Sequence, residues 1–150
     1  MKNQKGITLI ELLAAVSILL IISSIIYGVL ISSNKNYKNI SETVNLNQEA
    51  NLILATIRNY HQKEVHHTYD VNGKEIYKLM YDSTAKKAYI GASSPTTPLQ
   101  KEGLNIIIKI DGSELSGDKP IYPADPLYLY IKLYTQQGQS YEIETVIKQY

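Results

Sequence analysis

The longest apolar run of the chain lies at its N-terminus. Charged residues before it are confined to the leader MKNQKG and to Glu11, and an uncharged stretch then continues from Leu12 to Ile31. A helix of about 20 apolar residues is long enough to span the hydrocarbon core of a bilayer. The pattern therefore predicts a transmembrane helical segment over residues 7–31, preceded by a short leader, residues 1–6.

Beyond Ile31 the chain turns polar, but apolar positions continue at helical spacing and no proline interrupts them. The positions on this stripe are Ile40, Val44, Asn47, Ala50, Leu54, Ile57 and His61, and Leu46, Ile53 and Tyr60 broaden it. Such spacing is typical of an amphipathic helix with one buried face. We predict one helix from about Ile7 to Glu64, with its amphipathic continuation in residues 32–66.

Gly28 lies inside the apolar run. Glycine lowers helix propensity by about 1 kcal/mol relative to alanine, so a local softening of the helix would explain it. Close packing against another helix explains a missing side chain equally well.

From His67 onward the period of the pattern changes to two, which is typical of strands. Asn72-Gly73 separates two such runs and predicts a tight hairpin, because both residues tolerate positive φ at the turn. The predicted strands are His67–Val71, Glu75–Asp82, Lys87–Ala92 and Leu104–Asp111, and the predicted proline-containing loops are Ser93–Gly103 and Gly112–Pro126. Residues 67–150 thus form an antiparallel β domain.

The last two strands, Leu127–Tyr134 and Tyr141–Ile147, carry the clearest alternation. A three-residue loop with Gly138 in the left-handed conformation would place Lys132 opposite Glu142. The same register sets Ile131 opposite Ile143 and Tyr130 opposite Glu144. A long helix followed by antiparallel strands predicts an α+β fold, with the helix packed on the sheet.

Composition excludes several functions. The net charge of +1 does not favour bulk binding of nucleic acid or anionic lipid. The absence of cysteine excludes disulfides, thiolate metal sites and a cysteine nucleophile. No nucleophile–base pair, phosphate loop or metal signature occurs, so we expect neither an enzyme nor a bound cofactor.

Two ordinary interpretations of the N-terminus leave features unexplained. A secretory signal peptide has an apolar core of about 7–15 residues and a small-residue cleavage site, whereas this run is longer and lacks an Ala-x-Ala-like site. A plain single-pass anchor explains the length. It gives no role to Glu11, and an acid at a membrane span is costly without a partner.

The run Lys5-Gly6-Ile7-Thr8-Leu9-Ile10-Glu11-Leu12-Leu13 closely resembles the processing signal of type IV prepilins and pseudopilins. The resemblance implies that a prepilin peptidase cleaves between Gly6 and Ile7 and methylates the new amine of Ile7, where the family usually has phenylalanine. It also implies a pilin-like fold. Glu11 would act in assembly by meeting the N-terminal amine of an adjacent subunit.

Helix geometry is compatible with that role. Ile7 and Glu11 are one turn apart and share a helix face. In a medium of low dielectric constant an ion pair is much stronger than in water, and a lone charge is much worse. Whether the partner amine belongs to the same chain or to a neighbour stays open.

The resemblance also implies topology, partners and function. Lys2 and Lys5 favour a cytoplasmic N-terminus, and the globular domain would lie outside the membrane and, after assembly, in a cell-surface filament. The expected partners are prepilin peptidase, other pilins or pseudopilins and membrane lipid. The layout is most similar to minor pseudopilins of Gram-positive competence or type II secretion systems. The alternative is a single-pass anchored extracellular binding module that does not assemble.

Three further groups of residues are candidate sites. Tyr128, Tyr130 and Tyr134 share a strand face and would form either a subunit interface or a surface covered within the subunit; Glu142 and Glu144 disfavour nucleic acid there. His61, His66 and His67 lack the i, i+4 spacing of helical metal ligands and predict a solvated helix end. Asp111–Asp118 predicts a turn more than a calcium loop.

Overall fold

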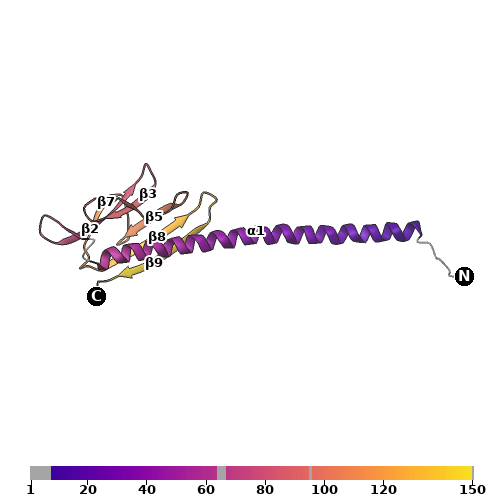
Figure 1. Ribbon diagram of the computed structural model, residues 1–150, viewed down its shortest axis with the longest axis horizontal. Helices are drawn as coiled ribbons and strands as arrows, with labels where there is room; N and C mark the ends of the chain where they lie inside the picture. Colours follow the sequence, from indigo (N-terminus) through magenta and orange to yellow (C-terminus); the bar gives the residue numbers. More distant parts are fainter. Residues whose placement is uncertain (1–7, 64–66, 95, 150) are drawn as a thin grey trace. The chain divides into compact units, whose positions relative to one another are not determined.

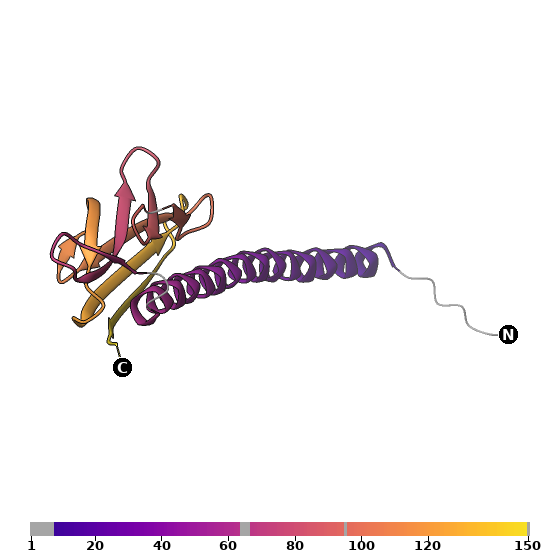
Figure 2. The ribbon, with the colours of Figure 1, turned by 60° about the vertical axis from the view of Figure 1, so that its left-hand side comes forward.

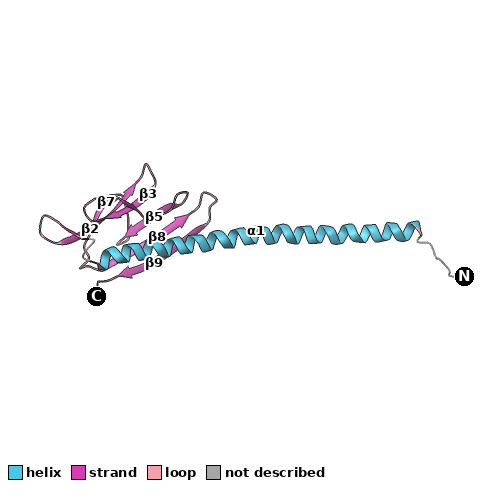
Figure 3. Cartoon of the chain, viewed as in Figure 1, coloured by secondary structure: helices cyan, strands magenta, loops and turns pink. Residues whose placement is uncertain are grey.

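Residues 8–63, 67–94 and 96–149 are described by the computed structural model. A single helix, α1 (Leu9–Gln62), runs through the N-terminal part of these residues, as Figures 1 and 3 show. The predicted long helix is therefore confirmed, and its predicted ends at Ile7 and Glu64 lie outside the described residues. The chain divides into two units, residues 1–41 and residues 42–150.

In the first unit the large apolar side chains of α1 are exposed on all sides of the helix. Between Leu9 and Ile31 their exposed fractions range from 50% at Val16 to 80% at Leu9. By length and composition, α1 can cross a membrane. The helix continues through Gly28, and a Cβ placed there would meet nothing within 4 Å. This surface is stable only in hydrocarbon or against other apolar helices.

The second unit contains the end of α1 and the strands, which Figure 1 labels in part. They are β1 (Thr68–Tyr69), β2 (Glu75–Asp82), β3 (Lys87–Gly91), β4 (Thr97–Pro98), β5 (Asn105–Ile110), β6 (Ser113–Glu114), β7 (Gly117–Ile121), β8 (Leu127–Tyr134) and β9 (Ser140–Ile147). Within the described residues they form two antiparallel sheets. One joins β1, β2, β3 and β4, with β7 also paired to β2, and the other has the order β6-β5-β8-β9. The fold is α+β, as predicted.

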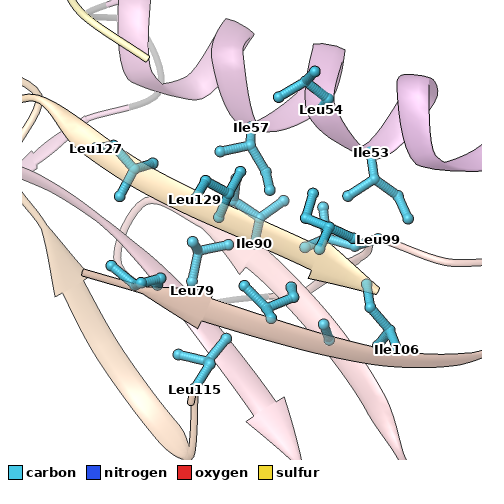
Figure 4. Close-up of a cluster of buried hydrophobic side chains, with 14 of the residues drawn as sticks. Ile53, Leu54, Ile57, Leu79, Ile90, Leu99, Ile106, Leu115, Leu127 and Leu129 are labelled. Carbon is cyan, nitrogen blue, oxygen red and sulfur yellow. The ribbon is translucent and has the colours of Figure 1, made fainter. Parts of the chain in front are cut away.

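One hydrophobic core joins the two sheets to residues 46–57 of α1. Ala50, Ile53 and Ile57 of the helix are fully buried, as are Ile131 and Leu133 of β8. Figure 4 shows helix side chains directed toward those of β8 and of the other sheet. Burial of each large aliphatic side chain contributes about 1.5–3 kcal/mol, so this core holds the second unit together.

The closing hairpin confirms the predicted register. Lys132 pairs with Glu142, Ile131 with Ile143 and Tyr130 with Glu144. Thr135 and Gln139 close a loop of residues 136–138, in which Gly138 has a φ of 91°. Alternating burial along β8 and the loop length together determine this register.

The prediction that Gly112–Pro126 is a loop was wrong. This segment contains β6, which pairs with β5, and β7, which pairs with β2 from Tyr77 to Tyr81. Glycine, aspartate and proline in β7 disfavour a strand, and the pairing with β2 is distant in sequence. Pro120 is tolerated because β7 lies at a sheet edge. The predicted loop Ser93–Gly103 likewise contains the short β4.

The β1–β2 hairpin was predicted correctly, but its turn was not. Gly73 N donates to Asp70 O, which places Val71 and Asn72 at the turn centre. Only Gly73 adopts positive φ, at 73°, and it follows the turn instead of forming its second centre. Asp70 Oδ1 accepts hydrogen bonds from the backbone N–H groups of Asn72 and Lys74, at 2.8 and 2.9 Å. This side-chain bonding favours the longer turn.

Candidate assembly site

The carboxylate of Glu11 caps the start of α1. Its Oε2 accepts hydrogen bonds from Thr8 N and Thr8 Oγ1, each at 2.9 Å. In return, Glu11 N donates to Thr8 Oγ1 at 3.4 Å. This reciprocal arrangement is a capping box, with Thr8 as the N-cap residue and Glu11 three positions later. The signal of this box, a threonine followed by a glutamate at i+3, is visible in the sequence.

The capping box holds the Glu11 carboxylate close to the start of the helix. The partial positive charge at a helix N-terminus favours an anion there. Gly6 and Ile7 lie outside the described residues. Because Ile7 directly precedes Thr8 in the chain, an amine created on Ile7 is only one residue away from a group that Glu11 binds.

The second candidate surface is the outer face of β8, which we call the tyrosine face (Tyr128, Tyr130 and Tyr134). Tyr128 is 57% exposed, and Tyr130 and Tyr134 are half-buried. The opposite face of β8, from Leu127 to Leu133, is buried in the core. Residues 46–57 of α1 belong to that core and therefore cover the other side of the strand.

Charged neighbours on the same sheet partly cover the tyrosine face. Lys109 Nζ lies 5.3 Å from the centre of the Tyr130 ring. Lys132 Nζ lies 2.6 Å from Glu142 Oε1. That hydrogen bond raises the pKa of Lys132 and lowers the pKa of Glu142. A cavity of about 430 Å³ opens beside Tyr128, Tyr130 and Val146 on this face.

The N-terminal residues that include the capping box match a known family. Residues 1–27 match the family described as the prokaryotic N-terminal methylation motif. The chain carries a prepilin-type N-terminal methylation motif, which supports the type IV prepilin and pseudopilin family. Comparison with curated proteins and with solved structures gives no match.

The histidines of this prepilin-type chain do not form the solvated helix end that we predicted. His61 is fully buried, and its Nδ1 lies 3.2 Å from the hydroxyl of Tyr77. The side chain of His67 is only 2% exposed; its Nε2 lies 2.6 Å from Tyr60 O and its Nδ1 3.3 Å from Glu75 Oε2. The prediction failed because β2 covers the end of α1. His66 lies outside the described residues.

Burial shifts the pKa values of His61 and Tyr77 in this cluster. Desolvation lowers the pKa of His61, and the charge of nearby His67 lowers it further. Burial also raises the pKa of Tyr77, which therefore remains a neutral phenol. Among the described residues no group of three or more His, Asp or Glu side chains could hold a metal ion.

The acidic residues of Asp111–Asp118 lie on different elements. Glu114 belongs to β6 and Asp118 to β7, and both are exposed. Asp111 adopts a φ of 53°, and its Oδ2 lies 4.0 Å from Lys119 Nζ. Asp111 and Gly112 thus form the turn between β5 and β6, and the segment continues through β6 into β7.

Proposed function

We propose that this chain is a minor pilin or pseudopilin, a membrane-anchored structural subunit of a type IV pilus-like filament that serves DNA uptake or protein secretion. Prepilin peptidase would remove the leader, residues 1–6, by cleavage between Gly6 and Ile7 and would methylate Ile7. The mature chain would then be held by its apolar helix until it joins other pilins in the filament.

The observation that carries the proposal is the position of Glu11. Its carboxylate is bound at the first turn of a helix whose large apolar side chains from Leu9 to Ile31 are all exposed. A charge at this place is costly in hydrocarbon unless an opposite charge meets it. The amine of Ile7 in a neighbouring subunit supplies that charge, and the pair would set the axial position of the new subunit.

Topology follows from the same proposal. The leader with Lys2 and Lys5 would lie in the cytoplasm, and residues 67–150 would lie outside the membrane. The tyrosine face supports contact with other pilins, because the exposed part of Tyr128 and the half-buried rings of Tyr130 and Tyr134 provide apolar area with polar tips.

The test separates the charge of Glu11 from its capping role. Glu11→Ala removes both, Glu11→Gln removes the charge and keeps an acceptor, and Thr8→Ala removes the cap and keeps the charge. We expect both Glu11 variants to insert into the membrane normally and to be lost from sheared filaments. Thr8→Ala should still be incorporated, since a lost cap costs only about 1 kcal/mol.

Normal incorporation of Glu11→Ala would contradict the proposed role of Glu11. Absence of the unsubstituted chain from sheared filaments would instead favour the anchored binding module that does not assemble. If Glu11→Gln assembled normally and Thr8→Ala did not, the cap and not the charge would be the functional feature.

A further inference from the structure

The β1–β2 hairpin presents an apolar side chain on a rigid turn, which we call the hairpin tip (residues 69–74). Val71 is fully exposed, and Tyr69 is 67% exposed. Asp70 fixes the turn through its backbone bond to Lys74 O and its side-chain bonds to Asn72 N and Lys74 N. Tyr122 supports the turn from the side, because its hydroxyl lies 3.4 Å from Asp70 Oδ2.

A rigid turn reduces the entropy lost on binding, because the bound conformation exists in advance. Hydrogen bonds to Asn72 N, Lys74 N and Tyr122 occupy the carboxylate of Asp70. Lys74 is exposed, with its Nζ 5.8 Å from the centre of the Tyr122 ring. The hairpin tip therefore offers a partner the apolar side chain of Val71, the exposed ring of Tyr69 and the charge of Lys74.

A pocket with complementary chemistry lies where α1 enters the second unit. This pocket, which we call the α1-start pocket, has a volume of about 370 Å³. Half-buried Leu104 supplies apolar surface, Glu42 supplies a negative charge, and Asn45, Gln136 and Gln137 supply amides. Leu46 also lines the pocket but is only 1% exposed, because it belongs to the core. None of the residues that line it is basic.

The hairpin tip and the α1-start pocket lie at opposite ends of the second unit. The pocket is lined by the first residues of α1 in this unit, whereas the hairpin tip follows the end of the helix. From Leu46 to Gln62 the helix rises about 25 Å. The hairpin tip and the 135–138 loop are at opposite ends in both Figure 1 and Figure 2.

We propose that the hairpin tip of one copy docks in the α1-start pocket of the next copy. Val71 would contact Leu104, and Lys74 would approach Glu42. A contact between two different surfaces at opposite ends of a domain is heterologous, and such a contact can repeat without closing, as a filament requires. This inference rests on the proposed filament function and specifies one contact within it.

Cysteine cross-linking tests the contact directly, because the chain contains no cysteine. The full-length chain carries Val71→Cys together with Gln137→Cys and is oxidised in the membrane and in sheared filaments. We expect a ladder of disulfide-linked oligomers from the double variant. Each single variant, as the matched control, can give at most a dimer.

A charge reversal gives an independent readout. Lys74→Glu or Glu42→Lys alone should lower the yield of a Val71→Cys, Gln137→Cys ladder about tenfold, and the combined reversal should restore it. A structural defect in either variant would not be repaired by the other substitution.

The ladder is scored in both fractions, so the contact is tested even if the chain does not enter filaments. A double variant that enters filaments normally but gives no ladder would overturn this contact and leave the proposed function intact. A ladder from Val71→Cys with Tyr128→Cys in place of Gln137→Cys would also overturn it, because the hairpin tip would then dock on the tyrosine face.

Discussion

Glu11 and Glu49 show how α1 stabilises a carboxylate in two different environments. Glu11 is bound by Thr8 at the helix start, in the part of the chain that is otherwise apolar. Glu49 is only 4% exposed; its Oε1 accepts from Lys101 N at 2.9 Å and its Oε2 lies 3.1 Å from Lys101 Nζ. A buried carboxylate is stable only when it is bound in this way. Glu49 thus connects the helix to the loop before β5.

His61 gives the second unit a dependence on pH. Its pKa in the folded chain is lowered from the ordinary value of 6.5, first by burial and then by His67. The unfolded chain therefore binds the proton more readily. As pH falls below about 6.5, we expect the free energy of unfolding to decrease by at most about 1.4 kcal/mol per pH unit from this group.

Urea unfolding of the full chain in detergent, followed by the near-ultraviolet circular dichroism of its tyrosines, measures this dependence. His61→Phe removes the titrating group and should flatten the pH profile between the ordinary and the lowered pKa. In His67→Gln, the neighbouring charge is absent but His61 is still buried, so the profile should keep part of its slope. An unchanged profile in His61→Phe would show that His61 does not titrate on unfolding.

The residue-scale errors of the sequence analysis have a common cause. His61 and His67 stand where the apolar stripe of the helix ends, and their polarity favoured a solvated position. Their burial depends on Tyr77 of β2, whose ring lies 5.9 Å from that of His61 and 6.2 Å from that of His67. A contact between side chains on a helix and on a later strand has no local signature in the sequence.

At the scale of elements, the sequence was most informative where local rules agree. In β8 and β9 the alternation of apolar residues, the Lys132–Glu142 pair and a glycine loop all favour one register, and the structure has that register. In β7 the local signals do not predict the strand, because Gly117, Asp118 and Pro120 all have low strand propensity. Its position depends on pairing with β2, which sequence periodicity does not reveal.

The 136–138 loop provides a prediction at this scale. Gly138 has a φ of 91°, and a Cβ at this position would meet no atom within 4 Å. The cost of Gly138→Ala is therefore conformational strain without a steric clash, and we expect it to lower the free energy of unfolding by about 1–2 kcal/mol. Urea unfolding in detergent is again the measurement.

Gln137→Ala is the matched control for Gly138→Ala. Gln137 is exposed in the same loop, so its replacement should change the free energy of unfolding by less than about 0.5 kcal/mol. Equal effects of the two substitutions would show that the loop does not require the left-handed conformation at residue 138.

At the scale of the whole molecule, the two units have different requirements. Residues 42–150 bury many of their apolar side chains in a core of their own, which contains side chains from α1 and from both sheets. Within the described part of the chain, the large apolar side chains of residues 9–31 are exposed and need lipid or other helices. The N-terminal signal could be recognised from sequence alone because its residues act at fixed spacing. The hairpin tip and the α1-start pocket could not, because each depends on the folded domain.

The proposed function depends on processing of the chain as a prepilin before it assembles. The most direct test is the intact mass of the protein purified from membranes that contain a prepilin peptidase. We expect a chain that begins at Ile7, lighter by residues 1–6 and heavier by one methyl group on its N-terminal amine. A protein that retains Met1, or one cut at Ser23 or Ser24 as a secretory signal would be, would contradict it.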